Sequence, residues 1–152
     1  MSTPRIKVVA KAGQTEVTAV VIGAVAVPVP AAVEDAAARL ANKEASESPL
    51  VAVDGHHWLV CARPEEEWLV GGEDWRSVGA AIVKRIRDAG FSSVEVPLAP
   101  EADAESLVEG CLLGDYLYTA CRSGAIAKRR KITVRLPGQT NAVKRALQVG
   151  QA

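Results

Sequence analysis

The sequence predicts an α/β fold in which helices flank a mixed central β-sheet in a three-layer arrangement. Short runs rich in β-branched residues alternate along the chain with amphipathic helical patterns. One pair of strands is joined by a tight hairpin, so the sheet is not all parallel. A length of 152 residues suits one domain with a proper core, and a hydrophobic content of 49% is ordinary for a globular protein.

Charge and cysteine content exclude several classes of protein. Lysine plus arginine equals aspartate plus glutamate, at 18 each, so no overall field attracts nucleic acid or anionic lipid. The longest apolar run, residues 19–33, is shorter than the roughly 20 residues that span a bilayer, and Pro28 and Pro30 interrupt it. The N-terminus lacks a secretory hydrophobic region. The three cysteines form no CxxC pair, so we expect buried free thiols and a cytoplasmic location.

The first part of the chain predicts two strands followed by a helix. Residues 6–10 are rich in β-branched side chains, and residues 18–25 form a continuous apolar run, as in a strand buried on both faces. Pro28 and Pro30 end the second strand. A helix is predicted over 31–43, because its apolar residues recur at helical spacing: Val33, Ala36, Ala37, Leu40 and Ala41.

The middle of the chain predicts a hairpin and a second helix. Residues 50–53 and 58–62 are apolar runs, and the Asp54-Gly55 pair between them is a strong hairpin signal. Residues 68–70 fit either a short edge strand or a loop that tucks Trp68 inward. We predict a helix over 74–89, capped by Asp74 and closed by a left-handed Gly90. Its buried stripe would be Trp75, Val78, Gly79, Ile82, Val83 and Ile86.

The last part predicts strands at 94–96 and 132–136, with helices at 103–122 and from about 140 to the end. Asp103 is the expected N-cap of the 103–122 helix. Gly110 and Gly114 lie one turn apart within it. Each costs about 1 kcal/mol relative to Ala inside a helix. This cost indicates that another backbone packs closely against the glycine face.

Few residues have the pattern of a reactive site. His56 and His57 are adjacent, so they point apart and are expected to be surface turn residues. No HExxH, GxSxG, Cys–His or glycine-rich phosphate motif is present. Gly71-Gly72 could present amides to an anion, but Glu73 and Asp74 favour helix capping there. We therefore predict no catalytic, cofactor-binding or metal-binding residue in this chain.

One basic cluster stands out, formed by Lys128, Arg129, Arg130 and Lys131. We interpret it as a solvated loop before a strand. A weak contact with nucleic-acid phosphates is the alternative interpretation. No aromatic residues interleave with the cluster, so base stacking is not indicated.

A family resemblance rests first on residues 107–116, LVEGCLLGDY, which resemble the "EG-x-LLG-x-Y" helix in the N-terminal domain of leucyl (cytosol) aminopeptidases. Residues 18–23 are similar to the family's "x-x-D-A-L-V-V-G" strand, with Thr18 in place of Asp. Residues 58–62 and the helix that contains Trp75 resemble a later strand and helix of that domain. The resemblance covers roughly residues 5–150.

The resemblance implies a macro-domain-like fold that precedes a catalytic domain with two divalent metals, zinc or manganese. Such enzymes release N-terminal amino acids from peptides. The family's "NTDAEGRL" metal motif is absent, so no catalytic residue carries over. We expect residues 1–138 to form the non-catalytic domain and 139–152 to begin the linker helix to a catalytic domain. The apolar stripe of that helix is expected to be only partly covered: Val143, Ala146, Leu147 and Gly150.

The resemblance thus implies a structural or assembly role, with the chain's own catalytic domain or further copies of the chain as partners. Two other functions remain open. Macro domains bind ADP-ribose through an Asp near the second strand and glycine-rich loops, but Thr18 and Pro28-Val-Pro30 occupy those positions here. The second of these other functions is that of a protein or DNA interaction module.

Overall fold

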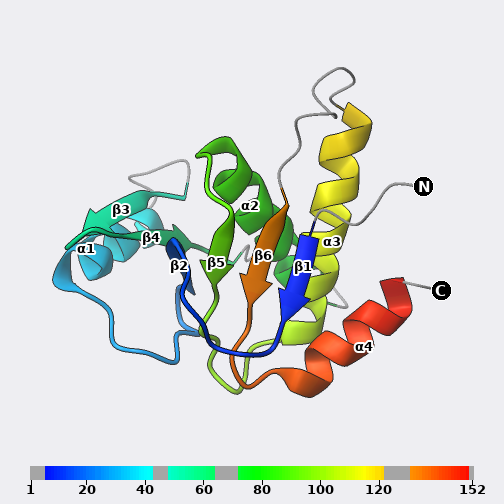
Figure 1. The fold of residues 1–152 in the computed structure, drawn as a ribbon. Coiled ribbons are helices and arrows are strands. Elements are labelled where there is room, and N and C mark those ends of the chain that lie inside the picture. Colours follow the sequence, from blue (N-terminus) through cyan, green and yellow to red (C-terminus); the bar gives the residue numbers. More distant parts are fainter. Residues whose placement is uncertain (1–5, 43–47, 64–71, 122–130, 151–152) are drawn as a thin grey trace.

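The computed structural model describes residues 6–42, 48–63, 72–121 and 131–150. Four helices and six strands lie in these ranges, in the order predicted from the sequence (Figure 1). They are β1 (Ile6–Val9), β2 (Val17–Val21), α1 (Ala31–Ala41), β3 (Leu50–Val53), β4 (His56–Cys61), α2 (Glu73–Asp88), β5 (Ser93–Glu95), α3 (Ala104–Cys121), β6 (Ile132–Arg135) and α4 (Thr140–Gly150).

The strands form one six-stranded sheet in the order β1-β6-β5-β2-β4-β3. Every neighbouring pair is parallel except the β3–β4 hairpin. The hairpin turn places both Asp54 (φ 49°) and Gly55 (φ 82°) in the left-handed region, as a type I′ turn requires. The mixed sheet that the Asp54-Gly55 signal predicted is therefore confirmed.

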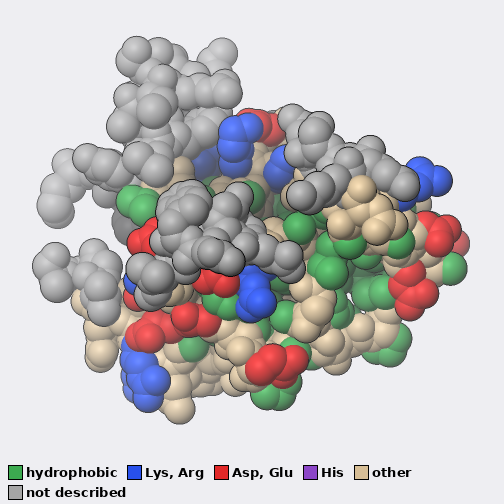
Figure 2. All heavy atoms as spheres, turned by 180° about the vertical axis from the view of Figure 1, so that it is seen from behind, with side chains coloured by type: hydrophobic (Ala, Val, Ile, Leu, Met, Phe, Trp, Pro, Cys, Tyr) green, Lys and Arg blue, Asp and Glu red, His purple; other side chains and the backbone are tan. Residues whose placement is uncertain are grey.

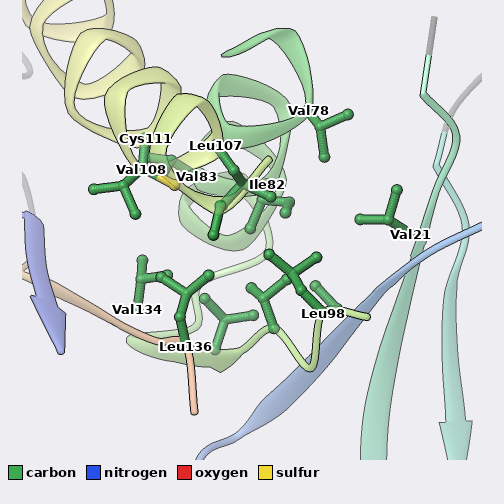
Figure 3. Packing of buried hydrophobic residues seen from close by; sticks show 14 of the residues in the cluster. Val21, Val78, Ile82, Val83, Leu98, Leu107, Val108, Cys111, Val134 and Leu136 are labelled. Atoms are coloured by element: carbon green, nitrogen blue, oxygen red, sulfur yellow. The ribbon is translucent and has the colours of Figure 1, made fainter. Parts of the chain in front are cut away.

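The helices cover the two faces of the sheet unequally. On one face, α2, α3 and α4 enclose the main core, and Figure 3 shows side chains from α2 and α3 directed toward Val134 and Leu136. On the other face, α1 covers the part of the sheet formed by β2, β4 and β3, where Val33 packs with Val20 and Val60. The chain is thus an α/β domain with a mixed sheet flanked by helices, as predicted.

The link from β1 to β2 crosses two strands without a helix (Figure 1). It must span three strand spacings, about 14 Å, and also return along the strand direction. A helix over residues 10–16 would reach only about 10 Å, so the link is extended. Glu16 joins it to the β5 region, because Ser92 N donates to Glu16 Oε1 (2.7 Å) and Glu16 N donates to Ser93 Oγ (2.8 Å). The link is therefore tied to the middle of the sheet at its far end.

Helices α2 and α3 pack at backbone contact, and glycines make this contact. A Cβ on Gly110 would collide with the carbonyl oxygen of Arg76, and one on Gly79 with the carbonyl oxygen of Leu107. A Cβ on Gly114 would lie 2.9 Å from the Cα of Ala80. The close backbone approach predicted from Gly110 and Gly114 is therefore confirmed.

Helix ends agree with the sequence in two places and differ in one. Asp103 caps α3: Ser106 N donates to Asp103 Oδ1 at 3.1 Å. Gly90, with φ 84°, follows α2, and Phe91 N donates to the carbonyl oxygen of Ile86 as a Schellman ending requires. The predicted Asp74 cap is wrong, since α2 begins at Glu73 after a left-handed Gly72 (φ 84°) and has no side-chain cap.

Two further predictions need correction. The apolar run 18–25 is not one strand, because Gly23 (φ 84°) turns the chain after β2 ends at Val21. The apolar stripe of α4 is also covered more fully than expected. Val143 (6% exposed) and Ala146 (0%) belong to the main core, and Leu147 packs against it. Val143 and Ala146 are thus buried against the domain itself and Leu147 is half-buried, while Lys144 and Arg145 are exposed; the burial of Gly150 is not described.

The surface seen from behind Figure 1 carries both signs of charge. Figure 2 shows red acidic and blue basic side chains interspersed with apolar ones, and no single sign covers this face. This agrees with the equal numbers of acidic and basic residues in the sequence.

Candidate functional site

The topology defines one position where a ligand crevice is expected, between the carboxyl ends of β2 and β5. These strands are parallel neighbours. The chain leaves β2 toward α1 on one face of the sheet and leaves β5 toward α3 on the other. Where successive connections diverge in this way, open α/β sheets bind their ligands. We call this position the switch-point crevice.

The loops that form the switch-point crevice are joined by their own backbones. Ala26 N donates to the carbonyl oxygen of Pro97 (3.2 Å), and Ala99 N donates to that of Ala24 (2.8 Å). Val25 and Leu98 form an isolated antiparallel bridge between these bonds. Residues 24–26 and 97–99 therefore hydrogen-bond to each other across the mouth of the crevice.

The side chains at this mouth are apolar, and some of them are buried, whereas Val25 is half-buried and Ala26 is exposed. Ala24 and Leu98 are each 5% exposed, and Ala99 is 8% exposed. Phosphate-binding loops present free backbone amides to the anion. Here the amides of Ala26 and Ala99 are already bonded to carbonyl oxygens, so they do not face a ligand.

Next to the crevice, the N-terminus of α3 is bonded to its own side chains. Asp103 Oδ1 accepts from the Ser106 amide, and Asp103 Oδ2 accepts from Ser106 Oγ at 2.8 Å. Gly72, at the start of α2, lies against this pair: a Cβ there would collide with Ser106 Oγ and lie 3.1 Å from Asp103 Oδ2. A carboxylate thus already occupies the positive end of the α3 dipole.

Charged side chains around the starts of α2 and α3 pair with one another. Arg76 Nε donates to Glu109 Oε2 (2.9 Å), and this bond is the main reason why the pKa of Arg76 is raised. Arg63 lies 3.4 Å from Asp74 and 5.4 Å from the centre of the Trp75 ring. The Arg63–Asp74 pair, with Arg63 about half exposed, is worth at most about 1 kcal/mol. The paired side chains cancel one another's charge, and both signs of charge occur on the surface around the starts of α2 and α3.

The histidines are not turn residues, which corrects the sequence-based interpretation. Both lie in β4 and are half-buried. His56 Nε2 is 2.7 Å from Oγ1 of the buried Thr18, and its ring stands edge-on to Trp58. The ring of His57 contacts Phe91 instead. The two rings therefore have separate partners, as their adjacency in a strand predicts. No sequence pattern pointed to the Thr18–His56 pair, because its members are distant in the chain.

The described cysteines are inert thiols within the main core. Burial raises the pKa of Cys61 and of Cys111 to about 12. No group of three or more His, Cys, Asp or Glu side chains in the described ranges is placed to hold a metal ion.

Two sequence interpretations fall largely outside the described residues. The basic cluster is represented only by the exposed Lys131, and residues 68–70 lie in an undescribed range. In the part of the chain that the structure describes, no helix has the length and hydropathy needed to cross a membrane.

The arrangement defines a macrodomain-like α/β fold in which residues 24–26 and 97–99 hydrogen-bond to each other at the switch-point crevice. A mutant of tomato leucine aminopeptidase is similar over 98% of this chain, with a TM-score of 0.60 and 14% identity; the match spans 37% of that chain. A mutant Oceanobacillus iheyensis macrodomain with ADPR is similar over 95% of this chain and 92% of its own, with a TM-score of 0.54 and 12% identity.

A third solved structure, an alphavirus P23pro-zbd, matches the whole chain over 25% of its own length, with a TM-score of 0.51 and 12% identity. No family model and no curated protein matches the sequence. At these identities the similarities show the fold. The chain spans well under half of the aminopeptidase and almost all of the macrodomain.

Proposed function

We propose that this chain is a non-catalytic domain of the type found at the N-terminus of leucyl aminopeptidase-like metallopeptidases, with a structural or assembly role. The parent enzyme would release N-terminal amino acids from peptides with two divalent metals, zinc or manganese, in a separate catalytic domain. The hydrogen bonding between residues 24–26 and 97–99 at the switch-point crevice is the observation that carries the proposal. A domain that binds no small ligand can fill this crevice with its own backbone.

Further support comes from the helix that resembles the family motif. Gly110 and Gly114 of that motif are the residues at which α3 meets α2. The motif therefore has a packing role here, which suits a supporting domain. The similarity to the tomato enzyme over 98% of this chain is consistent with the same role.

The proposal predicts that the chain alone has no peptidase activity. We expect no hydrolysis of leucine anilides or dipeptides with zinc or manganese, because a two-metal site needs several converging anionic ligands. The test is an assay of the purified chain, with a complete leucine aminopeptidase as the positive control. Metal-dependent turnover by the chain would overturn the proposal. Reading the gene beyond the codon for Ala152 for an "NTDAEGRL" motif is the complementary test.

An ADP-ribose-binding module is the second candidate, because a macrodomain with ADPR matches this chain over 92% of its own length. Titration calorimetry with ADP-ribose separates the two candidates. The first candidate predicts no heat of binding and no shift of the melting temperature, because the amides of Ala26 and Ala99 are already bonded. Binding that is lost when Ala99 is replaced by a bulkier Leu would instead favour the nucleotide module, provided that the variant keeps its circular dichroism spectrum.

A further inference from the structure

The sheet has two edges, and they differ in how well they are protected. β1 carries an exposed Lys7 on its edge. The other edge is β3, with the sequence LVAV, which contains neither charge nor proline (Figure 1). Exposed edges usually carry such residues, because their free N–H and C=O groups otherwise pair with another strand. The β3 edge therefore has the character of a strand-pairing surface.

The hairpin register shows which backbone groups face this edge. Val53 pairs with His56 across the two-residue turn, and Val51 pairs with Trp58. Hydrogen-bonded pairs alternate along an antiparallel ladder, and Val60 N donates to the carbonyl oxygen of Pro49 at 3.0 Å. Positions 49, 51 and 53 thus bond to β4. The N–H and C=O groups of Leu50 and Ala52 point away from β4, toward the edge, where no strand of the described ranges pairs with them.

The ends of this edge carry opposite charges. At its start, Arg85 donates to the carbonyl oxygen of Ser48 from Nη2 (2.9 Å) and Nε (3.2 Å). At its end, Asp54 is exposed in the turn and has no ion-pair partner among the described residues. A strand that runs antiparallel places its end beside the start of its partner. Among the described residues, the charges at the two ends of the edge, Arg85 and Asp54, are therefore complementary to each other.

We propose that β3 pairs antiparallel with β3 of a second copy of this chain, with a two-fold axis at Val51. Leu50 of each copy then lies opposite Ala52 of the other, and Ser48 lies opposite Asp54. This register pairs the outward-facing N–H and C=O groups of Leu50 and Ala52, while the carbonyl oxygen of Ser48 keeps its bonds to Arg85. It also brings each Asp54 near Arg85 of the other copy. The two sheets join into one continuous sheet.

The contact is short, so the dimer is weak and reversible. One four-residue strand per copy buries much less than the roughly 800 Å² per partner of a standard stable interface. The monomer–dimer balance therefore depends on protein concentration and on salt. The proposal is independent of the proposed function, because it concerns the edge of the sheet and not the switch-point crevice.

Sedimentation velocity over a range of chain concentrations tests the pairing. Ala52→Pro removes an N–H that the monomer does not use within its own ladder, so we expect a folded monomer at every concentration. Ala52→Ser keeps the N–H and is the matched control, for which dimer formation persists. Circular dichroism verifies the fold of both variants. A wild-type chain that stays monomeric throughout, or a dimer unchanged by Ala52→Pro, overturns the proposal.

Asp54→Asn tests the charge pairs, because Asn-Gly preserves the type I′ turn. Two symmetric exposed pairs of about 0.2–1 kcal/mol each predict a dimer roughly 2- to 30-fold weaker, with reduced salt dependence. An unchanged dissociation constant contradicts the proposed register.

Amide hydrogen exchange of the wild-type chain tests the pairing without any variant. Exchange at Leu50 and Ala52 should slow as concentration rises. Exchange at Val51 and Val53 should be protected at all concentrations, because these amides bond to β4. Rates at Leu50 and Ala52 that do not depend on concentration overturn the proposal.

Discussion

The carbonyl oxygen of Arg76 occupies the space into which a Cβ on Gly110 would project. The obstacle is backbone, so it cannot rotate away as a side chain would. Ala in a helix normally gains about 1 kcal/mol over Gly. At this position, the free-energy cost of overpacking should exceed that gain.

We therefore predict that Gly110→Ala lowers the free energy of unfolding by about 1–3 kcal/mol, measured by urea denaturation. Gly114→Ala is the matched comparison, since its nearest obstacle is the Cα of Ala80 at 2.9 Å and the loss should be smaller. Equal stability of wild type and Gly110→Ala would show that the two helices separate at little cost.

Loss of the α3 cap should also destabilise the domain. Asp103→Ala removes the acceptor of the Ser106 amide, which predicts a loss of about 1 kcal/mol. Asp103→Asn keeps a side-chain oxygen in place and should cost less. Thermal unfolding of the two variants measures the difference, and a melting temperature unchanged in Asp103→Ala would show that the cap is dispensable.

The pair formed by Thr18 and His56 predicts an energetic coupling across the sheet. A double-mutant cycle with Thr18→Val and His56→Ala should give an interaction energy of about 0.5–1.5 kcal/mol, the usual net value of one hydrogen bond. Additive effects of the two substitutions would mean that the bond contributes nothing to stability.

Burial of Cys61 and Cys111 predicts slow alkylation of both thiols in the folded chain. In a Cys121→Ser background, neither should react with iodoacetamide at about pH 8 on the timescale of a denatured control, because only thiolates react and both pKa values are about 12. Rapid labelling under native conditions would contradict their burial.

The same pKa values predict how stability depends on pH. Folding raises the pKa of each thiol. The contribution of each protonated thiol to the free energy of unfolding is therefore fully present below the unfolded pKa near 9.0. The free energy of unfolding should therefore fall as the pH rises from that value to about 12. Replacing Cys61 with Ala should reduce this slope, as measured by urea denaturation at a series of pH values.

Local signals in the sequence predicted the elements well, because the causes are local. Asp54-Gly55 adopts the turn that its residues favour, and all six predicted stripe positions of α2 are buried. The glycines of α3 indicated the backbone contact, although not which helix makes it. The prediction of an Asp74 cap was wrong for a tertiary reason. The residue before α2 lies against Ser106 of α3, where a Cβ on Gly72 would collide with Ser106 Oγ.

The candidate site was less predictable, because it depends on strand order. The insertion of β6 between β1 and β5, and the bonds between residues 24–26 and 97–99, join segments far apart in the chain. The hydrophobic periodicity of a sequence does not indicate which distant segments pair. The prolines at 28 and 30 argued against an open glycine loop, but they did not reveal the bridge between Val25 and Leu98.

The place of β1 in the sheet has a consequence for the order of folding. Its strand partner is β6, so Ile6 pairs with Ile132, nearly the whole chain later. A contact of such large sequence separation carries a high loop-closure entropy and forms late. During synthesis the first strand must wait until almost every other element has emerged. We expect hydrogen exchange during refolding to protect the α2–α3 pair first and β1 last.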